Sequence, residues 1–272
     1  MAERGARRSR RGAHRRAGPP RASPRRAAQR ADRAPRSMSL VLAFDTATAA
    51  TVVGLRDATG VVRGRRDDPA AGERPSHAST LLALADELLV EAGAQWGDVT
   101  RIGVGVGPGT FTGLRIGVAS ARGLAQASGA PLVPVSTLEA LAHAARAAGA
   151  HGAEQVLAVI DARRGEAFAA VWDAAGEQLA QPVAVAPEAL AGLVPNGSGT
   201  IVAVGDGAVR FRAPLEAAGL LVPGDADPLH RVDPAALCAL AAAGAVVAAE
   251  NLVPDYLRLP DAELARRLAD HQ

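Results

Sequence analysis

The stretch GVGVGPGTFTGLR, residues 103–115, decides the fold. It completes a glycine-interleaved strand predicted over Ile102–Val106 and begins a helix predicted over Thr112–Ser128, which ends at Gly129. A strand, a Gly-Pro-Gly loop and a helix N-terminus leave backbone N–H groups free and direct a positive dipole end outward, which suits an anion. The stretch is not a dinucleotide-binding fingerprint, because no G-x-G-x-x-G register fits it.

Two interpretations of this stretch stay open. In the first, the loop and the end of an earlier strand form a vestigial nucleotide or anion site, made of Asp45, Thr46, Gly107, Pro108, Gly109, Thr110 and Thr112. In the second, the glycines serve close packing of strand, loop and helix. A second helix could then approach a face of small residues, made of Gly113, Gly117, Ser120 and Ala121.

The residues before this stretch predict three strands and a helix. Residues 40–45 form an apolar run, and residues 51–56 and 61–66 form two more strands joined by a turn, so we expect an antiparallel meander. A helix is predicted to begin after Ser76, a good N-cap residue, and to end at Gly93. Its apolar stripe has helical spacing and consists of Leu81, Leu84, Ala85, Leu88 and Leu89.

The residues after the stretch predict a further strand at 132–135 and a helix at about 137–148. Ser136 and Glu139 form the capping box of that helix. The pattern then restarts with a hairpin of strands at 155–161 and 166–172. A helical segment at 187–193, a strand at 200–204 and a long helix at 234–249 complete the second half.

This restart indicates an α/β protein of two similarly built domains with a cleft between them. We expect a first domain over 38–139, which carries the partner-binding helices, and a degenerate second domain over 140–260. The last helix of the second domain is expected to pack back on the first. Residues 261–272 are expected to form a C-terminal tail.

Composition excludes several classes of protein. The chain has 272 residues, and all 30 basic residues are arginine, so a P-loop lysine, a kinase lysine and a Schiff-base lysine are all absent. The single cysteine, Cys238, excludes a disulfide framework within the chain and any multi-cysteine metal site. Aromatic residues make up 3% of the chain, which leaves little material for stacking on nucleic-acid bases.

The net charge of +2 averages two unlike segments. Residues 1–37 hold 13 arginines against two acids, whereas residues 38–272 hold 17 arginines against 26 acids and have a net charge of −9. Residues 1–37 lack Leu, Ile, Val, Phe, Tyr and Trp, so we expect them to be disordered. We expect Met38 to be the true start and the preceding stretch a mis-called extension; the alternative is an arginine-rich arm that binds RNA phosphates.

Residues that could carry chemistry are few. Asp45 ends the first strand, as in actin-like ATPases, but the turn after it, ATAA at 47–50, has no glycine for a phosphate, and the hairpin at Asp161–Gly165 lacks a glycine pair. No histidine pair has metal-binding spacing, and His77 is expected at the surface or in an interface. Cys238 lies in an apolar context that raises a thiol pKa and makes it inert. With no run of about 18 apolar residues, we expect a cytoplasmic protein.

The ordered motifs resemble a known family. They are LAFDTAT at 42–48, the helix start at Ser76-His77, GVGPGTFTGLRIG at 105–117, PVSTLEAL at 134–141, VIDARRGE at 159–166 and YLR at 256–258. Over about residues 38–260 they look like the TsaB family, also called YeaZ. Its members are the dimerisation subunits of the bacterial tRNA threonylcarbamoyladenosine complex. The resemblance begins at Met38, which agrees with the expected start.

The resemblance implies a degenerate two-domain actin-like fold (ASKHA, ribonuclease-H-like) that has lost catalysis. It implies pairing with a TsaD-type catalytic subunit, or with a second copy when the chain is alone, through helices at Ser76–Ala92 and Thr112–Ser128. It further implies a complex with a TsaE-type ATPase that modifies the adenosine next to the anticodon in tRNAs reading ANN codons. ATP and magnesium would be used by the partner subunits, tRNA would be bound indirectly, and this chain would need no cofactor of its own.

The first functional hypothesis is therefore a non-catalytic scaffold that meets its partner through one set of residues. That set is Ser76, His77, Leu81, Leu84, Ala85, Leu88, Gly113, Arg115, Gly117, Ser120 and Ala121. The alternative is an actin-like small-molecule kinase or ATPase, or a peptidase, that uses Asp45, Asp161 and the glycine loop. The glycoprotease label attached to the family finds no support in these residues. A third hypothesis is direct RNA binding by the N-terminal arm.

Overall fold

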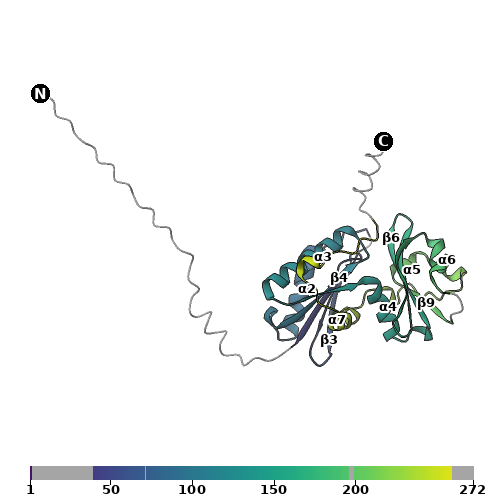
Figure 1. Ribbon diagram of the computed structural model, residues 1–272, viewed down its shortest axis with the longest axis horizontal. Helices are drawn as coiled ribbons and strands as arrows, with labels where there is room; N and C mark the ends of the chain where they lie inside the picture. The colour runs from purple at the N-terminus through teal and green to yellow at the C-terminus, as the bar shows by residue number, and fades with distance from the viewer. Residues whose placement is uncertain (2–38, 71, 196–198, 259–272) are drawn as a thin grey trace. The chain divides into compact units, whose positions relative to one another are not determined.

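A five-stranded mixed sheet forms the first half of the protein in the computed structural model (Figure 1). Its strands are β1 (Leu40–Asp45), β2 (Thr51–Arg56), β3 (Val62–Asp67), β4 (Val99–Gly107) and β5 (Leu132–Ser136), in the order β3-β2-β1-β4-β5. Strand β2 is antiparallel to both of its neighbours, β1 and β3. Strands β4 and β5 run parallel to β1. This order and these directions are those of a ribonuclease-H-like sheet, which is the building block of the actin-like fold.

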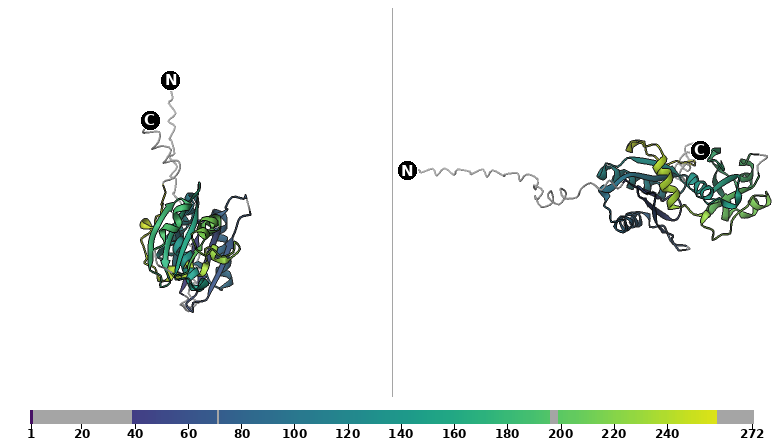
Figure 2. Two further views of the ribbon diagram at one scale, coloured as in Figure 1. Left: turned by 90° about the vertical axis from the view of Figure 1, so that its right-hand side faces the viewer. Right: turned by 90° about the horizontal axis from the view of Figure 1, so that it is seen from below.

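The alternating side chains of β1 explain why helices cover both faces of this sheet. Leu40, Leu42 and Phe44 share a core with α2 (His77–Glu91) and α3 (Phe111–Ser128) on one face. Val41 and Ala43 share a second core with α4 (Thr137–Ala147) and α7 (Pro234–Ala243). In Figure 2, α7 lies in the middle of the molecule, where it contacts both the first sheet and α4.

A four-stranded sheet forms the second half. Its order is β8-β7-β6-β9, with β6 at Gln155–Arg163, β7 at Glu166–Asp173, β8 at Gln178–Val185 and β9 at Ile201–Val204. The three strands β6, β7 and β8 are antiparallel, and β9 runs parallel to β6.

Helices also cover the second sheet on two faces. Val156, Ala158 and Ile160 join the core of α4 and α7, so one apolar core runs from the first sheet to the second. The opposite face packs against a 3-10 helix at Pro187–Leu193, α5 (Asp206–Arg210) and α6 (Arg212–Ala217). The α/β architecture is thus a pair of sheets joined through two shared helices, which is the actin-like arrangement.

The structure describes Met1 and residues 39–70, 72–195 and 199–258. Those from residue 39 onward belong to one compact unit, Met38–Gln272. The predicted tails at 1–37 and 261–272 lie outside these ranges, apart from Met1. Among the described residues, no helix combines the length and the apolar character needed to cross a membrane.

Four elements, β8, α5, α6 and α7, differ from the sequence prediction. Strand β8 was not predicted, because its segment QLAQPVAV lacks regular alternation and contains Pro182. Helices α5 and α6 have five and six residues, too short for a clear period. Helix α7 ends at Ala243 instead of residue 249, because the chain after Gly244 turns to pair with β5, where the Val247 N–H donates to the Leu132 carbonyl at 2.8 Å.

Packing of α7 against the sheet gives a test with a matched control. A Cβ on Gly103 in β4 would collide with the Ala241 side chain of α7. We expect Gly103→Ala to lower the free energy of unfolding by about 1–3 kcal/mol, because the core cannot absorb the extra atom. A Cβ on Gly123 in α3 would meet no other atom within 4 Å, so Gly123→Ala is expected to raise the free energy by up to about 1 kcal/mol. Urea unfolding measures both, and equal stability of Gly103→Ala and wild type would contradict this packing.

Candidate functional site

The glycine loop binds the turn between β1 and β2. The Thr110 N–H donates to the Ala47 carbonyl at 2.7 Å, and the Thr46 hydroxyl donates to the Gly113 carbonyl at 2.8 Å. A Cβ on Gly109 would collide with Ala47, and one on Gly113 would collide with the Thr46 carbonyl oxygen. The glycines are therefore required for close approach of α3 to the turn, which supports the close-packing interpretation.

Asp45 is enclosed at the centre of this contact. Its side chain is 0% exposed, and its carboxylate accepts hydrogen bonds from the Thr137 hydroxyl and the Ala47 N–H, each at 2.7 Å. Burial raises the pKa of this carboxyl above its ordinary value, and the two hydrogen bonds act in the opposite direction. An aspartate in this state supports the β1–β2 turn and faces no open site.

The other residues of the predicted anion site are placed accordingly. Thr46, Gly107 and Pro108 are buried, Gly109 and Thr110 are half-buried, and Thr112 is exposed. The Thr110 hydroxyl accepts from the Gly113 N–H at 3.3 Å, which caps α3. Asp45, Thr46 and Thr110 of the predicted anion site are thus bound to groups of the protein itself.

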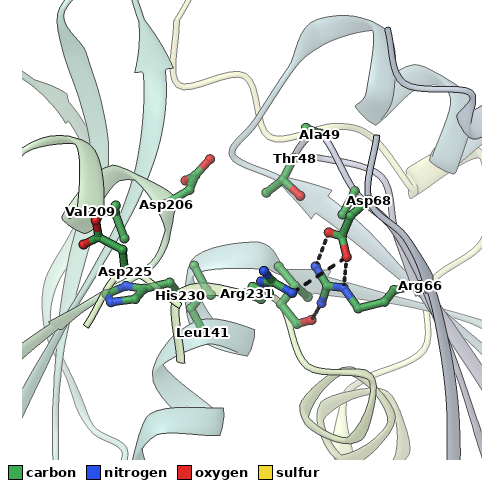
Figure 3. A pocket seen from close by; sticks show the side chains of 12 residues that line it. Thr48, Ala49, Arg66, Asp68, Leu141, Asp206, Val209, Asp225, His230 and Arg231 are labelled. Carbon is green, nitrogen blue, oxygen red and sulfur yellow. Dashed lines mark hydrogen bonds and ion pairs between the residues drawn. The ribbon is translucent and has the colours of Figure 1, made fainter. Parts of the chain in front are cut away.

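A cavity of about 280 Å³ lies between the β1–β2 turn and the start of α5 (Figure 3). Thr48, Ala49 and Ala50 line one side and Asp206 lines the other. The Arg66 guanidinium in this cavity is held by Asp68 through two bonds of 2.8 Å and donates to the Val232 carbonyl at 2.9 Å.

These residues do not fit a magnesium nucleotide. The turn presents no glycine, and the Asp45 carboxylate is buried in the core. Arg66, one of the arginines that line the cavity, already has its partners. We derive no chemical step from this cavity.

Most of the predicted partner-interface residues lie inside the protein, which corrects that prediction. Leu81 is 1% exposed, and it shares a core with the first sheet. The buried members of the set are His77, Leu81, Ala85, Leu88, Gly113, Gly117 and Ala121. The apolar stripe of α2 covers its own sheet, and the small residues of α3 admit the β1–β2 turn instead of a second helix. Ser76, Leu84, Arg115 and Ser120 keep partial or full exposure.

His77 is likewise a core residue and not a surface residue. Its Nδ1 is hydrogen-bonded to the Thr51 hydroxyl at 2.9 Å. Burial is the main cause that lowers the pKa of this imidazole. Ser76 precedes α2 as predicted, but its side chain does not cap the helix; its hydroxyl donates to Asp67 at 3.1 Å.

The solvent-facing sides of α2 and α3 form a surface that sequence reasoning missed. We call it the helix face; it consists of Ala78, Ser79, Leu82, Ala83, Asp86, Glu87 and Val90 of α2 with Arg115, Ala119, Gly123, Gln126 and Ala127 of α3. The two helices contact each other. Leu82 is 44% exposed and Val90 is 78% exposed. On α3, small residues recur at a spacing of four, which lets another helix come close.

An aromatic cluster lies at the N-terminal end of α3. The rings of Phe111 and Tyr256 are 5.3 Å apart between centroids. The Arg115 guanidinium lies 3.9 Å above the Phe111 ring and its Nε donates to the Tyr256 hydroxyl at 3.2 Å. Sequence reasoning singled out Arg115 but not the two rings, which are 145 positions apart in the chain and are joined only by the fold.

Two further expectations concern reactive groups. Burial raises the pKa of the Cys238 thiol to about 12, which confirms the prediction of an inert cysteine. Across residues 39–258, leaving aside the gaps at 71 and 196–198, no three His, Cys, Asp or Glu side chains gather in a way that could hold a metal ion.

Comparisons with known proteins point to one pathway. A family model described as "TsaD: tRNA N6-adenosine threonylcarbamoyltransferase" matches residues 72–265. The chain is 34% identical to the tRNA threonylcarbamoyladenosine biosynthesis protein TsaB of Escherichia coli, over 80% of this chain and 94% of that protein. It is 38% identical to the protein of the same name from Haemophilus influenzae, over 47% of this chain and 51% of that protein.

A solved structure agrees with these matches. YeaZ from Pseudomonas aeruginosa superposes with a TM-score of 0.67 at 29% sequence identity, and the match covers 81% of this chain and 100% of that one.

The role of Asp45 is tested by Asp45→Asn. Because folding raises the pKa of this carboxyl, the folded chain binds its proton more tightly than the unfolded chain, and the stability from that proton is lost as pH rises through the folded-state pKa. Asparagine does not ionise and keeps the same shape. We expect the variant to melt above wild type at pH 8, with the difference shrinking as pH is lowered through the folded-state pKa of Asp45.

Differential scanning fluorimetry as a function of pH checks this expectation. A variant that melts below wild type at pH 8 would show instead that the ionised carboxylate, through its two hydrogen bonds, stabilises the turn.

Proposed function

This chain belongs to the TsaB family, also called YeaZ, and from that premise we propose that it is the non-catalytic scaffold of a tRNA-modifying complex. The family places the chain in tRNA threonylcarbamoyladenosine biosynthesis. In our proposal it binds and activates a TsaD-type catalytic subunit, which transfers the threonylcarbamoyl group to N6 of the adenosine next to the anticodon in tRNAs reading ANN codons. The chain itself carries out no chemical step.

The observation that carries this proposal is the helix face. The core of the first sheet covers one side of α2 and α3, yet the other side still exposes Leu82 and Val90 on α2 and the small residues Ala119 and Gly123 on α3. Large apolar side chains next to small ones are suited to interdigitating with the ridges of a partner's helices. The face therefore fits a helical partner better than it fits water.

The aromatic cluster supports the same use. Aromatic and arginine side chains dominate the binding energy of protein interfaces, because they bury large areas and lose little conformational freedom. Arg115 is already held by Phe111 and Tyr256, so little of its freedom is left to lose on binding. The cluster begins where the helix face ends, at the first residues of α3.

A scaffold needs no nucleotide or metal of its own, and the enclosed Asp45 agrees with such a role. In this proposal ATP and magnesium act in the TsaD-type subunit and in a TsaE-type ATPase. The chain and its partners work in the cytoplasm. Without a partner, the helix face would pair with a second copy of the chain.

The helix face is tested by Leu82→Arg. Leu82 is 44% exposed, so the free chain can carry the arginine in water and stay folded. In an interface the guanidinium would be buried without a counter-ion, and we expect affinity for a TsaD-type subunit to fall by about 100-fold or more. Isothermal titration calorimetry with the purified subunit measures this loss.

Leu179→Arg is the matched control, because Leu179 is 40% exposed and lies on β8 of the second sheet. It is expected to bind like wild type. Equal affinities for all three proteins would remove the helix face as the binding surface. Charged substitutions at Leu81 or Leu88 are unsuitable probes, since both side chains lie in the core.

A further inference from the structure

The hairpin between β6 and β7 places arginines where glycine or asparagine is the usual residue. Arg163 and Arg164 have φ values of 64° and 55°, and Gly165 follows at 79°. Positive φ is disfavoured for residues with a Cβ, and a two-residue turn of this kind ordinarily takes Asn-Gly. Such a conformation at non-glycine residues points to a role for their side chains.

Other guanidinium groups gather around this turn. Arg163 and Arg210 both pair with Asp161, at 3.3 and 3.0 Å, and Arg258 pairs with Glu166 at 2.6 Å. We call Arg163, Arg164, Arg210 and Arg258 the arginine edge. Three of its cations share two carboxylates in these pairs, so the edge keeps a positive charge while residues 38–272 as a whole carry −9.

In the two Asp161 pairs the cations lie outermost, whereas in the Arg258–Glu166 pair the carboxylate is the more exposed partner, at 43% against 25%. The Asp161 side chain is 7% exposed, whereas the side chains of Arg163 and Arg210 are 62% and 50% exposed. The buried Asp161 carboxylate thus lies beneath the two exposed guanidinium groups and pairs with the Nη1 atom of each. The remaining N–H groups of a guanidinium form a rigid fork that matches phosphate oxygens.

The edge lacks the features of a protein-binding surface. Among the described residues, neither the hairpin nor α5 carries an exposed large apolar side chain, whereas protein interfaces have a hydrophobic centre. Phosphate backbones are bound by arginines alone, without apolar contacts. The observations therefore favour a nucleic-acid backbone.

We propose that the arginine edge contacts the phosphate backbone of the tRNA directly, so that the chain is part of the RNA-binding surface of its complex. This inference rests on the proposed function for the identity of the RNA. It assigns this contact to residues of the β6–β7 hairpin, α5 and the segment after Tyr256, none of which belongs to the helix face.

The test variant removes the charges of Arg163 and Arg164 and at the same time relieves the backbone strain of their positive φ angles. In Arg163→Gly/Arg164→Asn the turn becomes Asn-Gly and the preceding residue becomes glycine, while the Arg163 backbone N–H that donates to Asp161 is kept. We expect the melting temperature to rise by about 2–4 °C. We expect affinity for an unmodified tRNA transcript to fall about tenfold, and the slope of log affinity against log salt to shrink by about 1.5, because two phosphate contacts are lost.

Fluorescence anisotropy at several salt concentrations measures tRNA binding by the full chain alone and by its complex with a TsaD-type subunit. The control is Arg63→Ala/Arg65→Ala on β3, which removes two half-buried arginines elsewhere and is expected to retain wild-type affinity and slope. In the modification assay the hairpin variant should raise KM for tRNA and leave kcat unchanged.

Three outcomes would overturn the inference. The first is a hairpin variant that binds tRNA with wild-type affinity and salt slope. The second is a control variant that weakens tRNA binding as much as the hairpin variant does. The third is a hairpin variant that no longer binds the TsaD-type subunit but still binds tRNA, which would make the arginine edge a protein contact. If the wild-type chain itself fails to join the TsaD-type subunit, the proposed function fails, and tRNA binding by the chain alone still decides the role of the edge.

Discussion

The contact between the start of α3 and the β1–β2 turn determines what this protein can do. The hydrogen bonds from Thr110 to Ala47 and from Thr46 to Gly113 draw the helix onto the turn, and glycines at 109 and 113 make that distance attainable. Asp45 is an internal support of the same turn, because its carboxylate is bound by Thr137 and by the Ala47 N–H. The same contact fixes α3 so that its opposite side faces solvent, where it can meet a partner.

The sequence predicted the architecture well, because the apolar patterns of β1, α2, α3 and α4 are long and regular. It could not separate burial in the chain's own core from burial by a partner. The stripe of Leu81, Ala85 and Leu88 looks the same in both cases, and only the structure shows that it covers the first sheet. The exposed Leu82 and Val90 do not interrupt the apolar stripe of α2, so the sequence pattern did not indicate them as binding residues. The link of Phe111 to Tyr256, and of Arg210 to Asp161, depends on tertiary contacts that spacing does not encode.

Polar groups around the β1–β2 turn are bound inside the protein. Arg66 with Asp68 and Asp45 with Thr137 show this pairing inside the fold. Residues left exposed on α2, α3 and the β6–β7 hairpin then become available for contact with other molecules. In our proposals the helix face takes the protein partner and the arginine edge takes the RNA.

The central claim is that the chain enables tRNA modification without performing it. The most direct measurement incubates unmodified tRNA with a TsaD-type subunit, a TsaE-type ATPase and a threonylcarbamoyl-AMP synthase, with and without this chain, and quantifies the modified nucleoside by mass spectrometry. We expect modified adenosine only when the chain is present, and an equal yield when Asp45→Asn replaces it. An unchanged yield without the chain, or no yield with Asp45→Asn, would contradict the claim.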